Sequence, residues 1–161
     1  MPVLELGQRL EIHYEEVGEG QPVIFIHGVW CSGRYFRKQL SELGKKYHVI
    51  TLDLRGHGGS THMEDGHTMG VYAQDLHEFI KKKNLNDVIL AGWSMGCMVI
   101  WDYFNKFGNK NILGTILIDQ SPSDFKWPDW DYGVFDLRSL TDFMSQVQTD
   151  REKVFRNFIS I

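Results

Sequence analysis

The sequence is poor in cysteine, has no excess of basic residues and contains no long apolar run. Its two cysteines, Cys31 and Cys97, lie far apart and form no CxxC or zinc-ligand spacing, which favours a reducing, cytoplasmic setting. The 161 residues carry 17 basic and 21 acidic side chains, a net charge of −4, so no nucleic-acid or anionic-membrane partner is expected. The uncharged run at residues 88–101 is too short to span a bilayer, and no signal peptide is expected at the N-terminus.

The composition is that of a folded domain, because 42% of the residues are hydrophobic and 13% are aromatic. Apolar or alternating runs predict strands at residues 3–6, 10–17, 22–26, 47–54, 87–91 and 112–118. Helical patterns predict a helix capped by Ser32 with Phe36, Leu40 and Leu43 on one face, a helix capped by Thr68 and ended by Lys81–Lys83, and a helix over residues 95–107. This alternation predicts an α/β core over residues 1–120 with a mainly parallel sheet.

The chain changes character after residue 120. Residues 121–161 hold 8 aromatic side chains in 41 positions, against 13 in the first 120. Pro122, Pro128 and Gly133 interrupt the first half of this segment, and residues 136–147 and 150–159 then have helical patterns. We expect residues 121–161 to begin a helical cap rather than another strand–helix unit.

The strongest motif is Gly92-Trp93-Ser94-Met95-Gly96, a match to G-x-S-x-G. It follows the predicted buried strand at 87–91 and opens the helix at 95–107, which is the setting of a nucleophile elbow. In such a turn the serine hydroxyl is raised above the carboxyl edge of the sheet, at the positive end of a helix. The alternative is an ordinary serine at a helix N-terminus. The context favours Ser94 as a catalytic nucleophile.

A second motif, His27-Gly28, ends the predicted strand at 22–26. In this setting the following loop supplies one backbone N–H of an oxyanion hole, here that of Val29, and the residue after the serine, Met95, supplies the other. His27 itself has two interpretations, a general base or a side chain that holds the loop through hydrogen bonds. The second is favoured.

The glycine-rich segment at residues 52–60 matches neither phosphate-binding pattern, so nucleotide binding is not expected. Asp53 and Arg55 are expected to brace the loops as an ion pair. His57, His62 and His67 recur at intervals of five without the compact cluster that a metal needs, so we expect solvated loop histidines and no metal site.

Together these elements resemble the α/β-hydrolase superfamily, over about residues 3–123. The similarity is carried by His27-Gly28, Ser32-Gly33-Arg34-Tyr35-Phe36, Asp53-Leu54-Arg55-Gly56-His57-Gly58-Gly59-Ser60, Met69-Gly70-Val71-Tyr72-Ala73-Gln74-Asp75-Leu76 and the Ser94 motif. Among its branches the chain is most similar to the esterases, perhydrolases and cofactor-free haloperoxidases, and Ile118-Asp119-Gln120-Ser121-Pro122 fits that group. The resemblance implies an α/β-hydrolase fold that is incomplete after its sixth strand.

The resemblance also implies a mechanism, in which Ser94 attacks an ester-like carbonyl and forms an acyl-enzyme, without metal or organic cofactor. The aromatic side chains of the cap predict that the substrate is small and mainly apolar. Peroxide in place of water as acceptor would give perhydrolysis. The side chains expected to line the substrate pocket are His27, Trp30, Trp93, Phe125, Trp127 and Trp130.

The sequence departs from the family pattern in one respect. The family's triad order is Ser, then Asp or Glu, then His, yet every histidine here precedes Ser94. Asp119 is a candidate acid, and a loop-bracing aspartate is the favoured alternative. We therefore expect a completing C-terminal segment or second polypeptide that supplies the histidine. A catalytically inactive binding or receptor module is the other hypothesis.

Overall fold

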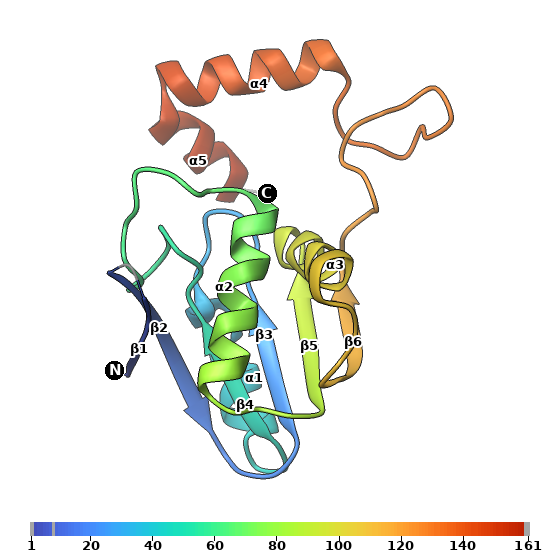
Figure 1. The fold of residues 1–161 in the computed structure, drawn as a ribbon. Helices are drawn as coiled ribbons and strands as arrows, with labels where there is room; N and C mark the ends of the chain where they lie inside the picture. Colours follow the sequence, from blue (N-terminus) through green and yellow to red (C-terminus); the bar gives the residue numbers. More distant parts are fainter. Residues whose placement is uncertain (1, 8, 160–161) are drawn as a thin grey trace. The chain divides into compact units, whose positions relative to one another are not determined.

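The computed structural model describes residues 2–7 and 9–159, and its centre is a six-stranded sheet in the order β1-β2-β4-β3-β5-β6 (Figure 1). The strands are β1 (Val3–Gly7), β2 (Leu10–Val17), β3 (Pro22–Ile26), β4 (His48–Leu52), β5 (Val88–Trp93) and β6 (Ile112–Ile118). β1 and β2 pair antiparallel, and β2 pairs antiparallel with β4. The other three pairings, β3–β4, β3–β5 and β5–β6, are parallel, as the sequence predicted.

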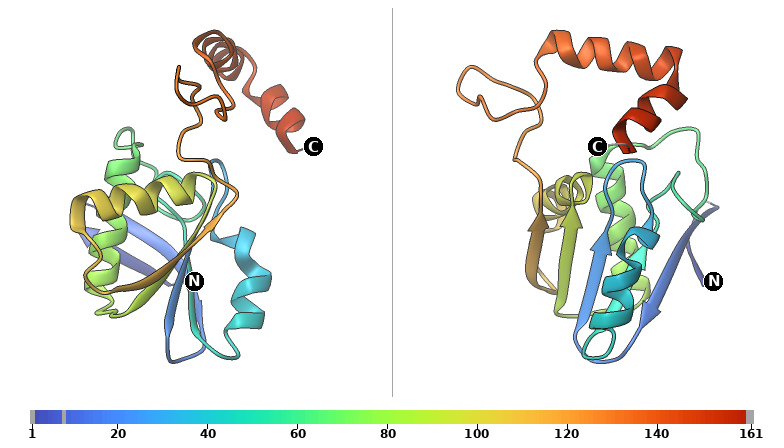
Figure 2. Two further views of the ribbon diagram at one scale, coloured as in Figure 1. Left: turned by 90° about the vertical axis from the view of Figure 1, so that its right-hand side faces the viewer. Right: turned by 180° about the vertical axis from the view of Figure 1, so that it is seen from behind.

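Helices cover both faces of this sheet (Figure 2). On one face, α2 (Met69–Lys82) and α3 (Met95–Phe107) pack against side chains such as Ile24 and Ile26 of β3. On the other, the 3-10 helix η1 (Gly33–Phe36) and α1 (Arg37–Leu43) pack against Val23 and Phe25 of the same strand. Because neighbouring residues of β3 are buried on opposite faces, the strand is apolar throughout, which explains its unbroken hydrophobic run.

The helix caps differ from the sequence prediction. Ser32 and Thr68 occupy the N-cap positions, but neither side chain makes a capping hydrogen bond. The first helix also begins as the 3-10 turn η1, and Leu43 is 36% exposed rather than buried with Phe36 and Leu40. The prediction that Ser32 and Thr68 precede helices as N-cap residues is confirmed, but the side-chain hydrogen bonds expected of such caps are missing and Leu43 is partly exposed.

The chain divides into two compact units, residues 1–120 and 121–161. The second unit contains α4 (Leu137–Thr149) and α5 (Arg151–Ile159). Asp136 precedes α4 and forms a capping box with Ser139, so Asp136 is the N-cap and not the first helical residue. Within the described residues, none of the helices combines the length and apolar character that crossing a bilayer would need.

Strand β6 forms one edge of the sheet and is unusually apolar for an edge. Its side chains Leu113, Ile116, Leu117 and Ile118 are 37–61% exposed. Exposed edges of soluble proteins normally carry lysine, proline or a bulge that prevents further pairing. β6 therefore has the composition of an internal strand in an edge position.

Candidate active site

The residues that directly follow the four parallel strands all lie at the carboxyl end of the sheet. His27 follows β3, Asp53 follows β4, Ser94 follows β5 and Asp119 follows β6. The chain leaves β3 toward β4 and leaves β5 toward β6, on opposite sides, so the carboxyl ends of β3 and β5 form the topological switch point of the sheet. Ligands of open α/β sheets bind at this crevice.

Ser94 occupies a strained turn between β5 and α3. Its backbone has φ 50° and ψ −121°, in the positive-φ region that residues with a side chain rarely adopt, at a cost of about 1–3 kcal/mol. Two backbone hydrogen bonds hold the turn: the Ser94 N–H donates to the Ile118 carbonyl at 3.0 Å, and the Cys97 N–H donates to the Ser94 carbonyl at 2.8 Å. The turn has the form of a nucleophile elbow, with a half-buried serine at its apex.

The two glycines of the motif are required by the closeness of helix and strands. A Cβ atom at Gly92 would lie 2.6 Å from the carbonyl group of Gly96, and one at Gly96 would lie 2.2 Å from the carbonyl oxygen of Ile26. Both contacts are with backbone atoms, which cannot rotate aside. The glycines therefore allow α3 to start directly against the ends of β3 and β5.

The loop after β3 approaches the elbow at Gly28. A Cβ atom at Gly28 would lie 3.2 Å from Ser94 Cβ and 2.9 Å from the Trp93 ring. Within the described part of the chain, the backbone N–H groups of Val29 and Met95 donate to no protein acceptor. Met95 is the first residue of α3, where an N–H has no intrahelical partner. Neither N–H is therefore committed to another group of the described chain.

His27 anchors this loop and is fully buried. Its Nε2 accepts a hydrogen bond from the Leu54 N–H at 3.1 Å, so Nδ1 must carry the proton, which it donates to the Gly28 carbonyl at 2.8 Å. Burial lowers the pKa of His27 from 6.5 to about 4, and the nearby His57 ring, 5.0 Å away between centroids, also lowers it. His27 is a neutral loop anchor. The expectation that its side chain lines the substrate pocket is wrong.

The buried neutral His27 should make the protein sensitive to acid. The pKa of His27 is lower in the folded state, so the unfolded chain binds more protons as the pH falls. The contribution of neutral His27 to the free energy of unfolding is therefore complete above pH 6.5 and is lost as the pH falls toward 4. The loss amounts to about 3 kcal/mol. We expect His27→Gln to be less stable than wild type near neutral pH. In urea unfolding, the difference in the free energy of unfolding between the two proteins should be smaller by about 3 kcal/mol at about pH 4. His62→Gln, at an exposed histidine, should follow the wild-type profile; parallel profiles for His27→Gln would contradict the assignment.

Asp53 is the second anchor of the same loop. Its carboxylate accepts hydrogen bonds from the Gly33 N–H at 2.6 Å and the Gly59 N–H at 2.8 Å, and pairs with His13 Nδ1 at 2.8 Å. His13 lies on β2, so Asp53 joins β2 to the loops that follow β3 and β4. The charge of a carboxylate that is 3% exposed is thus met by three donors.

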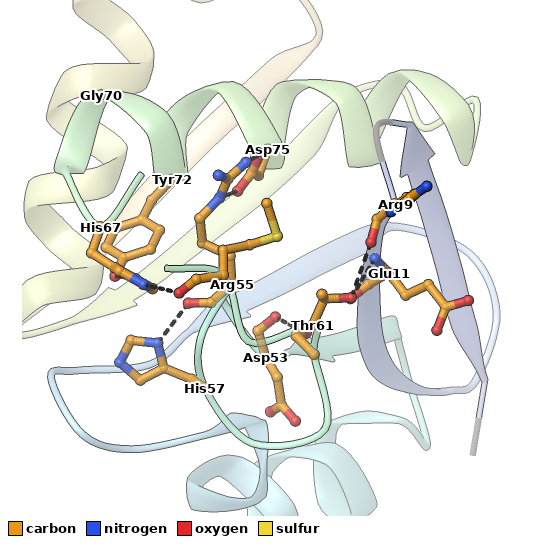
Figure 3. A network of polar contacts seen from close by, with 12 residues as sticks. Arg9, Glu11, Asp53, Arg55, His57, Thr61, His67, Gly70, Tyr72 and Asp75 are labelled. Atoms are coloured by element: carbon orange, nitrogen blue, oxygen red, sulfur yellow. Dashed lines mark hydrogen bonds and ion pairs between the residues drawn. The ribbon is translucent and has the colours of Figure 1, made fainter. Parts of the chain in front are cut away.

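Arg55 does not pair with Asp53, as the sequence had suggested. Its guanidinium donates to both carboxylate oxygens of Asp75 on α2, at 2.6 and 2.7 Å. Figure 3 shows the Arg55 side chain reaching Asp75, while the carboxylate of Asp53 points away from it. The predicted Asp53–Arg55 ion pair is wrong because each partner has a better-placed acceptor or donor on another element.

No histidine of the described chain hydrogen-bonds the Ser94 hydroxyl. His13 and His48 pair with the carboxylates of Asp53 and Glu16, and His57 contacts the carbonyl of Arg55 at 2.9 Å. His67, although exposed, contacts the Tyr72 hydroxyl and the Met63 carbonyl, His62 is exposed, and His77 stacks on Phe107. His57 is a loop histidine as expected, but it is half buried beside the rings of His27 and Tyr72. Over residues 2–7 and 9–159, no three His, Cys, Asp or Glu side chains could together hold a metal ion.

Asp119, the candidate acid, is exposed and has φ 52°. Among the described residues its carboxylate hydrogen-bonds neither a histidine nor a loop backbone group. Neither role predicted for Asp119, triad acid or loop brace, has a partner group within the described residues.

The aromatic residues expected at the pocket fall in both units. Trp93 stacks on Tyr35 with a centroid distance of 4.2 Å and an interplanar angle of 4°. Trp30 is half buried and has φ 60°. In the second unit, Phe125 contacts Trp127 at 4.9 Å between ring centroids, and Trp130 contacts Tyr132 at 5.3 Å. Tyr35 was not anticipated, because nothing in its sequence neighbourhood indicates a partner 58 positions away.

Comparison with known proteins agrees with this geometry. A model of the alpha/beta hydrolase fold family matches residues 21–156. The chain is 34% identical over 164 residues to a putative non-heme chloroperoxidase of Synechocystis, covering 98% of the chain and 59% of the relative. It resembles the crystal structure of a bromoperoxidase from Bacillus anthracis at 32% identity with a TM-score of 0.91, covering 98% of this chain and 58% of that one. It also resembles an esterase from Exiguobacterium antarcticum at 28% identity with a TM-score of 0.88, covering 92% of this chain and 56% of that one. The chain thus spans less than two thirds of each of these relatives.

Proposed function

The chain belongs to the alpha/beta hydrolase fold family, and on this basis we propose that the protein is a serine hydrolase that cleaves small apolar esters through an acyl-enzyme. The observation that carries the proposal is the elbow: Ser94 sits at positive φ at the switch point of the sheet, beside two unpartnered backbone N–H groups. Relatives named as esterases and non-heme haloperoxidases support the same class of chemistry.

In the proposed reaction, Ser94 Oγ attacks the carbonyl carbon of the ester and gives its proton to a histidine base. The carbonyl oxygen becomes an oxyanion, which the N–H groups of Val29 and Met95 stabilise; one such donor is worth about 3–4 kcal/mol of barrier. The C–O bond to the alcohol then breaks, and the protonated histidine returns the proton to the leaving oxygen. Water repeats the sequence on the acyl-enzyme and releases the acid, and hydrogen peroxide in its place would release a peracid.

The base of this reaction is proposed to come from a segment outside residues 1–161. All seven histidines of the chain precede Ser94, and within the described structure none contacts its hydroxyl. The apolar edge of β6 supports the same proposal, because a further strand paired there would bury Leu113 and Ile116. That segment would place its histidine at the same carboxyl edge of the sheet, where Asp119 is a candidate to orient it.

The substrate is proposed to be small and mainly apolar, because the second unit is rich in aromatic side chains. Phe125, Trp127 and Trp130 of that unit are candidates to cover the acyl group. We expect kcat/KM for p-nitrophenyl esters to be greatest for acetate to butyrate and to fall by about tenfold at octanoate. A preference for long or charged acyl groups would contradict the proposed substrate class.

The second candidate, an inactive binding module, is favoured by the absence of a histidine contact to Ser94 within the described residues. Measured on the protein together with the proposed completing segment, the ester series separates the two functions. A binding module would turn over none of the esters, whereas the proposed enzyme hydrolyses the short ones.

A further inference from the structure

A cavity of about 250 Å³ opens between the C-terminal ends of α2 and α3. It is lined by Lys81 of α2, Phe107 of α3 and the turns that follow these helices. Ser94 lies at the opposite end of α3, so the length of that 13-residue helix, about 20 Å, separates the cavity from the candidate nucleophile. The proposed hydrolysis uses none of the residues that line it.

One wall of the cavity is a stack of flat rings. The His77 imidazole lies on the Phe107 ring with 4.0 Å between centroids and an interplanar angle of 11°. Tyr103, which is buried, contacts the same Phe107 ring at 5.3 Å. Ile80 and Leu85 add aliphatic surface. A wall of this kind favours a planar apolar group, because aromatic side chains pack well against a ring and bury apolar area with it.

The rim of the cavity is positively charged. Lys81 and Lys110 both line it and are exposed, and the described residues that line it include no aspartate or glutamate. This is a local reversal of sign in a chain whose net charge is −4. His77 Nδ1 is also buried without a hydrogen-bond partner among the described residues, which is rare in native proteins. The charges favour an anion over a cation or a neutral ligand.

The cavity is preformed by rigid turns. Asn84 and Asn111 line it with φ 52° and 67°, a conformation that asparagine tolerates better than most residues. The backbone holds both turns: the Leu85 N–H donates to Ile80 at 3.0 Å, and the Val88 N–H donates to the Asn111 carbonyl at 2.8 Å. Ligand binding would therefore require little further ordering of the backbone.

We propose that this cavity is a binding site for a small aromatic carboxylate. The ring lies against the His77–Phe107 stack, and the carboxylate lies between the ammonium groups of Lys81 and Lys110. The volume is slightly below the range of about 300–1,000 Å³ usual for ligand pockets, which limits the ligand to about one ring. The site is independent of the proposed hydrolysis.

Isothermal titration with benzoate at low ionic strength tests the site. We expect benzoate to bind with Kd on the order of 1 mM or below, benzamide at least about fivefold more weakly, and benzylamine not measurably. Lys110→Glu should weaken benzoate binding by at least about tenfold, because it reverses one of the two rim charges. Lys38→Glu is the matched control, because it makes the same charge change at an exposed residue of α1, on the opposite face of the sheet (Figure 2). Its Kd for benzoate should stay within about twofold of the wild-type value.

Three outcomes would overturn the proposal. Benzoate with Kd above about 10 mM, or benzylamine bound more tightly than benzoate, would reject an anion site. Equal affinity of the wild type and Lys110→Glu would place benzoate elsewhere, including at Ser94. Because Lys110 is exposed, its variant should fold, and far-ultraviolet circular dichroism checks this. Lys81→Glu provides a second variant with the same expected loss.

Discussion

In the protein that includes the proposed completing segment, replacing Ser94 with alanine should reduce the hydrolysis of p-nitrophenyl acetate by at least about 10⁴-fold, which is the usual consequence of removing the nucleophile of a serine hydrolase. The fold should persist, because alanine at φ 50° bears the same backbone strain as serine and Ser94 Oγ makes no hydrogen bond to another described side chain. The loss should appear in kcat, since the missing group forms a covalent bond and contributes little to ground-state binding.

A fluorophosphonate probe provides an independent measurement of the same assignment. Peptide mass spectrometry should find the adduct on Ser94 in the wild type and no adduct in Ser94→Ala. Ser41→Ala, which removes an exposed hydroxyl from α1, is the control and should retain wild-type rate and labelling. Labelling at another residue, or more than about a tenth of wild-type turnover in Ser94→Ala, would show that the nucleophile lies elsewhere.

The second large effect is expected at Gly96. Alanine there would place its Cβ 2.2 Å from the carbonyl oxygen of Ile26, so α3 must move away from the end of β3. Because both elements belong to the buried core, we expect the free energy of unfolding to fall by about 3 kcal/mol or more in urea titrations. The same movement would displace the Met95 N–H from the oxyanion position. The variant should therefore also lose activity under conditions where it remains folded.

Gly114→Ala is the matched control for this prediction. Gly114 lies in β6, and a Cβ atom there would have no neighbour within 4 Å. The same chemical change should therefore alter the free energy of unfolding by no more than about 0.5 kcal/mol. If both variants were equally stable, the close approach of α3 to β3 would not be a feature of the protein in solution.

The elements that surround Ser94 could be predicted because their signals are local. The bounds of α3 and β6 agree with the sequence prediction at 95–107 and 112–118, since an apolar run flanked by glycine or asparagine turns determines each. Family membership and the α/β-hydrolase fold are confirmed as well. The elbow was predictable because Gly92 and Gly96 are needed wherever a helix begins this close to a sheet.

The anchors of the loop after β3 could not be predicted, because they are long-range contacts with backbone groups. Asp53 is held by His13, 40 positions earlier, and by the N–H of Gly33, and a backbone donor carries no residue signature. Arg55 likewise pairs with Asp75 on α2 rather than with Asp53, which is nearer in the sequence, because the pairing depends on where the helix packs. The absence of a capping hydrogen bond from Ser32 has a related reason. The residue type indicates an N-cap position, but it does not determine the rotamer on which the side-chain hydrogen bond depends.

The strain at Ser94 also has a consequence for evolution. Glycine adopts φ 50° without the penalty that serine bears, so Ser94→Gly would remove the nucleophile and relieve about 1–3 kcal/mol of strain. Stability and activity therefore oppose each other at this one position. In a lineage that keeps the fold for binding alone, selection would no longer retain the serine, and drift toward glycine would be favoured. A serine kept at this position across close relatives would record continued selection for the reaction.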